Sequence, residues 1–175
     1  VGWFQDYWIA RNPQRACGTA CDPEHERLVG RLPQADALYH SSRVAHTTRW
    51  QLDLPDLAAT RAYLAESLAE TLSLLATTPE TDAALYFFRL VLFHEDMHGE
   101  AGIYMAQALD IPLSDVLLAA AVPLPAARPL VLPAGQWTLG WNGDGFAFDN
   151  ELAPHVLAMP TFAIDSEVVS WRRYL

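Results

Sequence analysis

The chain has 175 residues and a formal net charge of −10 at pH 7, with 21 acidic residues against 11 basic ones, all of them arginine. No basic stripe can form that would neutralise the phosphates of nucleic acid, so we expect small molecules as partners and no nucleic acid. No apolar run reaches the roughly 18 residues of a membrane-spanning helix and no signal peptide is visible, so we expect no membrane contact and a cytoplasmic location.

The length fits one domain, or one domain with part of another. Because the composition changes at a proline-rich stretch, we expect a helical domain over residues 1–122, a linker over 123–129 and the beginning of a second domain over 130–175. The chain starts at Val1 without an initiator methionine, and residues 171–175 read as the first turns of a helix. Both features favour a fragment of a longer protein.

A short helix and a long connection come first. Residues 1–10 are helical in pattern and rich in aromatic rings, most of which we expect in the core. Residues 12–55 show turn signals and little periodicity, and a connection of that length usually has a function. It brings Arg43, His46 and Arg49 together, as either a binding loop or a solvated surface loop. Cys17 and Cys21 lie in the same connection and are expected to be free thiols, since no second cysteine pair completes a zinc site.

Two long helices are predicted next. Asp56 can cap a helix that runs to about residue 76, with a leucine stripe at positions 57, 64, 68, 72 and 75. After Pro79, a second helix is predicted over residues 82–109. Spacings of three and four define one stripe of this helix that should face a core. The stripe comprises Phe87, Val91, His94, His98, Ala101 and Met105.

His94 and His98 are the candidate metal ligands. Residues four apart on a helix lie roughly 5–6 Å apart at Cβ, close enough for both imidazoles to bind one ion. Two hydrogen-bonded core histidines are the alternative. The acidic neighbours Glu95, Asp96 and Glu100 favour the metal site.

The same stretch satisfies the H-E-x-x-H pattern of zinc metalloproteases, in which the glutamate is the general base. A metzincin would need a glycine and a third histidine where Ala101 and Tyr104 stand. Other zincins take a glutamate from a following helix, but after Glu100 the next glutamate is Glu151, beyond the prolines. The protease hypothesis therefore lacks a third ligand.

The C-terminal part is predicted to begin with two short strands, over residues 130–135 and 136–140, followed by a glycine-rich turn at 142–145.

Two separate stretches of the chain resemble the same protein family. His94-x-x-x-His98-x-Glu100 is similar to the iron motif of the DinB-like bundle in ergothioneine synthases of the EgtB type. The segments 132–135, 139–140 and 145–151 resemble the opening of the formylglycine-generating-enzyme-like domain that follows this bundle. The resemblance implies a mainly α fold, with a DinB-like four-helix bundle followed by the start of an α+β domain.

It also implies a mononuclear nonheme iron centre, Fe(II) held by three histidines, that uses O2 to join a thiol or selenosugar donor to the imidazole of trimethylhistidine (hercynine). In the family the third histidine stands immediately before a helix that begins with a Trp-Phe pair. Since Trp3 and Phe4 form such a pair, the third ligand is expected just upstream of Val1. His46 is the alternative candidate, because Ala45-His46-Thr47-Thr48 resembles the family's sequence around that ligand, but it lies in the long connection and is followed by Arg49 in place of an aromatic pair.

The resemblance further implies a role for Glu100 beside a ligand imidazole, and for Arg43 and Arg49 in holding the carboxylates of the donor. The catalytic acid is expected in a missing C-terminal part, so the fragment alone should be inactive. Asp96, Met97 and Gly99 stand where typical ergothioneine synthases have glutamines, which favours the selenoneine synthase branch, SenA. The alternatives are a zinc hydrolase and a noncatalytic DinB-like metal-binding bundle.

Overall fold

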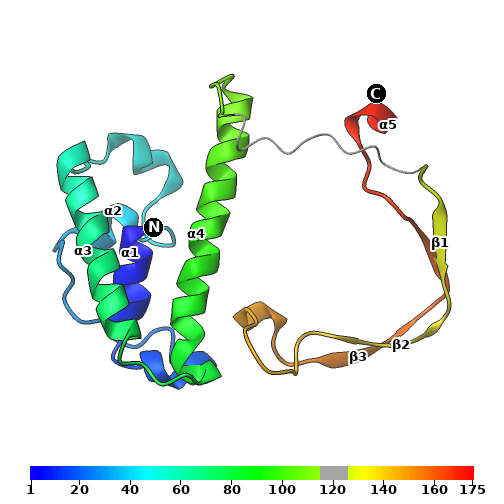
Figure 1. Cartoon of the computed structure of the whole chain (residues 1–175), viewed down its shortest axis with the longest axis horizontal. Coiled ribbons are helices and arrows are strands. Elements are labelled where there is room, and N and C mark those ends of the chain that lie inside the picture. Colours follow the sequence, from blue (N-terminus) through cyan, green and yellow to red (C-terminus); the bar gives the residue numbers. More distant parts are fainter. Residues whose placement is uncertain (115–125) are drawn as a thin grey trace. The chain divides into compact units, whose positions relative to one another are not determined.

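The computed structural model describes residues 1–114 and 126–175, without the side chains of Trp171 and Arg172. It divides into two compact units: Val1–Ile111 with Asp144–Phe146, and Pro112–Gly143 with Ala147–Leu175. Among the described residues the first unit is helical and the second contains short antiparallel strands (Figure 1). This agrees with a mainly α chain followed by the start of an α+β domain. Part of the predicted linker, residues 123–125, lies outside the described residues.

The N-terminal helix of the first unit changes type after one turn. Helix α1 (Gly2–Gln5) continues into a π-helical turn, η1 (Asp6–Ala10), which confirms the helix predicted over residues 1–10. The backbone N–H of Arg11 donates to the carbonyl of Asp6 at 2.8 Å, closing the wide turn. Such single π turns are rare and are often found at functional sites.

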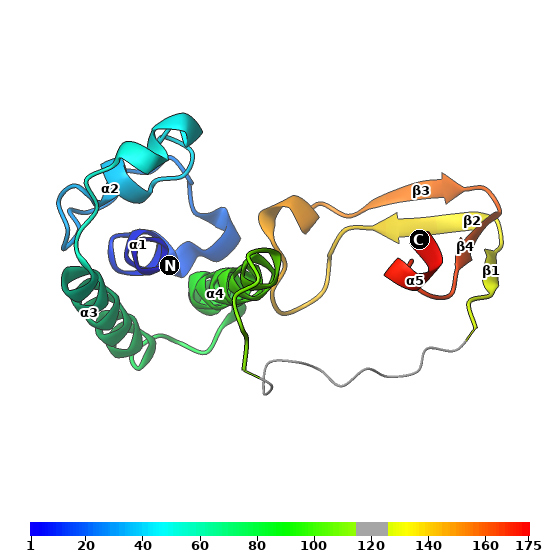
Figure 2. The same cartoon turned by 90° about the horizontal axis from the view of Figure 1, so that it is seen from above.

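Helices α3 (Leu57–Leu75) and α4 (Asp82–Ala108) confirm the two predicted long helices. Each begins at a side-chain cap: Asp56 accepts from the N–H of Ala59 at 2.8 Å, and Thr81 from that of Ala84 at 3.2 Å. A cap of this kind contributes about 1 kcal/mol. Figure 2 shows α1 between α3 and α4. None of the helices in the described ranges combines the length and apolarity needed to cross a membrane.

The leucine stripe predicted on α3 is exposed in the described structure, with Leu68 and Leu72 at 48% and 55% exposure. The face of α3 toward the N-terminal helix carries Tyr63 and the buried Ser67, and Tyr63 donates to Asp6 at 3.3 Å. The spacing of the leucines identifies an apolar stripe, but burial depends on which partner packs against a face, and the sequence of one helix does not identify that partner.

The core of the first unit lies along the N-terminal half of α4. Phe87 and Val91, both on the predicted stripe, are buried there with Ile9. Trp8 stacks on Phe87 with ring centroids 5.2 Å apart. Toward the C-terminal end the stripe becomes exposed, and Met105 has 54% exposure, so the second half of the stripe does not face a core.

The connection between the N-terminal helix and α3 is more ordered than the sequence indicates. It contains three short helices: η2 (Arg15–Ala20), α2 (Ala35–Tyr39) and η3 (His46–Gln51). Gly18 has a φ of 56°, and a Cβ at that position would come within 2.8 Å of the Cα of Ala83, so η2 approaches α4 closely. Cys17 and Cys21 are free, as predicted.

Among the described residues of the second unit, four strands form two antiparallel pairs. Strand β1 (Pro129–Leu132) pairs with β4 (Phe162–Asp165), and β2 (Gly135–Leu139) pairs with β3 (His155–Met159), as Figure 2 shows for β2 and β3. Strands β1 and β2 match the prediction, whereas β3 and β4 were not predicted. Helix α5 (Trp171–Tyr174) matches the helical turns expected at residues 171–175.

Candidate metal centre

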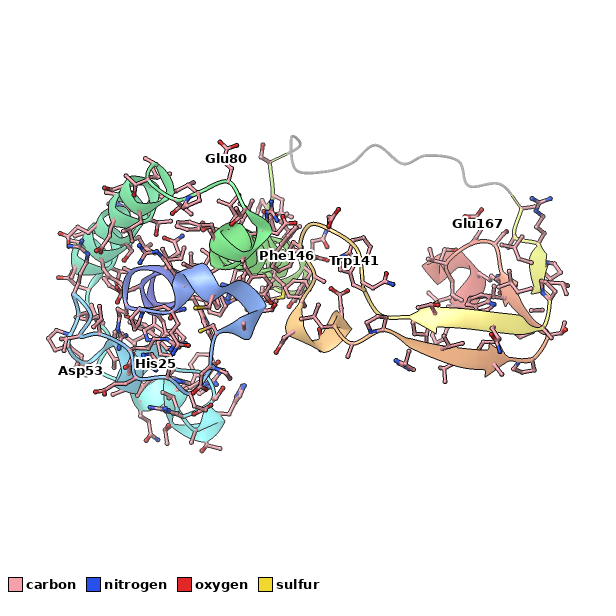
Figure 3. The ribbon with its side chains drawn as sticks, turned by 90° about the horizontal axis from the view of Figure 1, so that it is seen from below. His25, Asp53, Glu80, Trp141, Phe146 and Glu167 are labelled. Atoms are coloured by element: carbon pink, nitrogen blue, oxygen red, sulfur yellow. The ribbon has the colours of Figure 1, made fainter. Side chains whose placement is uncertain are left out.

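A cavity of about 990 Å³ lies within the first unit, and both candidate ligands line it. Its walls come from the N-terminal helix, α3, α4 and the connection at residues 23–24 and 39–43. Six aromatic side chains line it: Trp3, Phe4, Tyr7, Trp8, Tyr39 and Tyr63. The four rings of the N-terminal helix are half-buried, and two of them, Phe4 and Trp8, also pack against the core, so the expectation that most of these rings belong to the core is met only in part. Figure 3 shows the packed side chains of this unit, with Asp53 and Glu80 at its periphery.

Helix α4 brings the two histidines together because they are four residues apart. The ring centroids of His94 and His98 are 4.5 Å apart, with an interplanar angle of 68°. His94 is half-buried and His98 is exposed, so the stripe, which is buried at Phe87 and Val91, borders a cavity at the two histidines.

The imidazole of His94 is covered on one face by Phe4. The two ring centroids are 3.7 Å apart and the planes are within 5° of parallel. Burial, with smaller effects of the neighbouring His98 and of the positive N-terminus, lowers the pKa of His94 to about 4. His94 is therefore neutral near pH 7 and keeps a nitrogen lone pair, as a metal ligand must.

The two imidazoles fit a metal ion as a pair, but they do not complete a site. No group of three or more His, Cys, Asp or Glu side chains in the described part of the chain could hold an ion. Structural and catalytic sites for transition metals usually take three or more protein ligands. Val1 lines the same cavity as the two histidines.

The connection brings one of the two predicted arginines to the cavity. Arg43 lines the wall together with Ser41 and Ser42. Arg49 donates to the carbonyl of Ser41 at 3.0 Å and does not line the cavity, so within the described residues it supports the loop. His46 is exposed and is also absent from the lining.

The acidic neighbours Glu95 and Glu100 do not line the cavity that contains the two histidines. At 100° per residue, Glu100 lies about 200° around the helix from His98. It is exposed and makes no hydrogen bond within the described ranges, so its role beside a ligand stays a prediction. Glu95 accepts a hydrogen bond from Gln5 at 3.0 Å and is not part of the lining.

Sequence reasoning missed the residues that fix the cavity wall. The carboxylate of Asp36 accepts from Trp3 Nε1 at 2.7 Å and from the two terminal nitrogens of Arg11 at 2.7 and 2.9 Å. These bonds tie α2, just before the lining residues 39–43, to the N-terminal helix. Hydrogen bonds from Arg11, and then from Trp3, lower the pKa of Asp36 to about 2 against the opposing effect of burial. An isolated acid in a connection gives no sequence signal of such a role.

No protein-family profile matches the chain. A hercynine oxygenase of Mycolicibacterium thermoresistibile is 28% identical over 186 aligned positions, which include the whole chain and 39% of that protein. The chain thus spans about two fifths of the length of this curated relative. It is similar to part of an oxidoreductase, and the similarity suggests an EgtB-like family.

Proposed function

We propose that this chain is part of a nonheme iron(II), O2-dependent enzyme that forms a C–S or C–Se bond on the imidazole of trimethylhistidine. The observation that carries the proposal is the placement of His94 and His98 with adjacent rings on one cavity wall, with Arg43 on another. The similarity to a hercynine oxygenase supports the same reaction class.

Bound iron(II) would supply open positions for the chalcogen donor and O2. His94 and His98 would hold it through neutral imidazoles, and Arg43 would bind an anionic group of the donor. In the overall reaction the hydrogens of the imidazole C2–H and of the S–H or Se–H group leave with one oxygen atom as water. The second oxygen atom ends on the chalcogen, so one O2 accepts four electrons.

The third ligand in this proposal is a histidine just upstream of Val1. The position of Val1 on the cavity wall supports it, because a preceding residue would begin at the cavity that the histidine pair lines. His46 is less suitable, since it lies outside the cavity lining and is exposed. The proposed role of Glu100 is to contact the imidazole of a metal ligand. Because Glu100 lies about 200° around α4 from His98, that imidazole would have to come from outside the described residues.

The proposed domains are a DinB-like bundle over residues 1–122, a linker over 123–129 and a formylglycine-generating-enzyme-like domain from residue 130. Exposed apolar side chains support a larger bundle: Leu72 on α3 and Met97 on α4 have 55% and 58% exposure. Another helix of a bundle would cover such faces. In this proposal a selenosugar donor is favoured over a thiol, because Asp96, Met97 and Gly99 stand where typical ergothioneine synthases have glutamines.

The zinc hydrolase alternative requires Glu95 to act as general base at the same ion. Its hydrogen bond to Gln5 and its absence from the cavity lining count against that role. A noncatalytic bundle would contain the same histidine pair but would show no O2-dependent chemistry.

The test is an assay of the polypeptide encoded by the complete reading frame, loaded anaerobically with Fe(II) and then exposed to O2. Trimethylhistidine is supplied with a thiol or with a selenosugar, and products are identified by mass spectrometry. The proposal predicts a C–S or C–Se product only with O2 and iron. Peptide hydrolysis with Zn(II) and no O2 uptake would support the hydrolase instead. Metal binding without either reaction would support the noncatalytic bundle.

A further inference from the structure

Two ring stacks join the N-terminal helix to α4. Phe4 stacks on His94 with centroids 3.7 Å apart, and Trp8 stacks on Phe87 with centroids 5.2 Å apart. Both are nearly parallel, with interplanar angles of 5° and 9°. Only the first of them involves a candidate metal ligand, so the two contacts can be compared directly.

The imidazole plane of His94 has no other fixed support. The last torsion of a histidine side chain is broad and roughly two-fold, so the helix alone does not set the ring plane. Metal-binding histidines usually have their plane fixed by a hydrogen bond from the second ring nitrogen. Within the described residues, neither ring nitrogen of His94 has such a bond, and the face of Phe4 is its closest ring contact.

A stack on the ring face orients the imidazole without blocking it. The nitrogen lone pairs lie in the plane of the ring, so a ring parallel to that plane leaves both nitrogens free at the edge. Phe4 is itself held in place, because it packs against the core and lies 6.1 Å from Trp8. The next residues along, Gln5 and Glu95, are joined by a 3.0 Å hydrogen bond, which fixes the register of the two helices at this level.

We propose that Phe4 is a positioning residue that sets the plane of the His94 imidazole for metal binding. The proposal rests on the metal role of His94 in the proposed function. The orientation of the ring, however, is a property of the metal-free chain and can be measured separately.

The first measurement is the NMR spectrum of the imidazole of His94 in the metal-free chain. The ring of Phe4 should shift the His94 ring protons upfield. Phe4→Leu should remove that shift, whereas Phe4→Tyr should retain it. Phe87→Leu is the matched control, since it removes the other stack and leaves both Phe4 and Trp8 unchanged, so the His94 shift should persist. Phe4→Met is used if Phe4→Leu does not fold.

The second measurement is the affinity for Co(II) of the polypeptide encoded by the complete reading frame, followed by its visible absorption. Loss of a group that orients a ligand typically weakens binding by about tenfold or more. Phe4→Leu should show that loss, while Phe4→Tyr and Phe87→Leu should bind as the wild type does.

The outcomes separate the two proposals. Wild-type affinity in Phe4→Leu would overturn the positioning role and leave the metal role of His94 intact. A tenfold loss in Phe87→Leu as well would also overturn it, because general loosening of the helices would then explain both. If the wild-type polypeptide does not bind Co(II), the metal role fails and the positioning role fails with it. Persistence of the upfield shift in Phe4→Leu would instead show that Phe4 does not stack on His94, and would overturn the positioning role alone.

Discussion

Arg11 forms a bidentate ion pair with Asp36, in which its two terminal nitrogens lie 2.7 and 2.9 Å from the two carboxylate oxygens. This ion pair attaches α2 to the N-terminal helix. The guanidinium is largely buried, with 9% side-chain exposure, while the carboxylate is 39% exposed. The wall of the cavity at residues 39–43 begins directly after this attachment.

Replacing Asp36 by Asn should destabilise the chain by about 1–3 kcal/mol, because Arg11 would be left buried without its counter-charge. The partial exposure of Asp36 places the effect toward the lower end of that range. Urea unfolding of wild type and Asp36→Asn measures it. Asp53→Asn is the control, since Asp53 is an exposed acid in the same connection. A difference below about 0.5 kcal/mol, the usual effect of a surface substitution, would contradict the attachment.

The contribution of Asp36 should also depend on pH. Its pKa is about 2 in the folded chain against 3.8 for the unperturbed group, so the folded chain binds this proton less readily than the unfolded one. The stabilisation is present above about pH 4 and is lost as the pH falls toward 2. The stability gap between wild type and Asp36→Asn should therefore shrink over this window. A constant gap would show that the carboxylate charge contributes nothing.

The contribution of Asp6 to stability should change with pH in the opposite direction. Burial raises the pKa of Asp6 above 3.8, against the lowering effects of Arg11 and of the Tyr63 hydrogen bond. Its contribution to stability is therefore fully present below about pH 4 and is lost as the pH rises through the raised value. Asp6→Asn avoids this loss, so its stability relative to wild type should increase between about pH 4 and pH 7. Urea midpoints across that range provide the measurement, and a relative stability that falls with rising pH would contradict the direction of the shift.

Gly30 should tolerate no side chain, because a Cβ there would come within 2.6 Å of Asp6 Oδ2 and 3.0 Å of Arg11 Cδ. Gly30→Ala should cost about 1–3 kcal/mol through overpacking. Gly102→Ala on α4 is the matched control, since nothing lies within 4 Å of its Cβ, and a helical alanine should stabilise by about 1 kcal/mol. Thermal unfolding of both variants tests the pair. Equal effects would mean that the connection does not approach the helix at Gly30.

The sequence predicts those parts of the fold that depend on local signals. Asp56 and the pattern after Pro79 identify α3 and α4, and the spacing of four identifies the histidine pair. The buried face of α3 could not be predicted, because it is set by a contact between Tyr63 and Asp6, which are fifty-seven positions apart in the sequence. The stack of Phe4 on His94 and the ion pair of Arg11 with Asp36 are likewise long-range contacts. No periodicity within one segment encodes them.

The strands show the same division. The segment that forms β2 has turn residues at its ends and was predicted, but its partner β3 lies beyond the glycine-rich turn and was not. Pairing across such a separation depends on which edges meet in three dimensions. The same limit applies to the cavity. The sequence indicates that Trp3 and Tyr7 are aromatic residues of a helix and favours a place in the core, but both rings line the cavity.

The most direct test of the proposed metal centre is anaerobic titration with Fe(II) of the polypeptide encoded by the complete reading frame, followed by nitric oxide and electron paramagnetic resonance. His94→Ala and His98→Ala serve as the ligand variants, and His46→Ala as the control outside the cavity. The proposed centre predicts the high-spin signal of a nonheme iron nitrosyl complex in wild type and in His46→Ala, and its loss in both ligand variants. Equal signals in wild type and His94→Ala, or loss of the signal only in His46→Ala, would contradict the assignment of the histidine pair on α4.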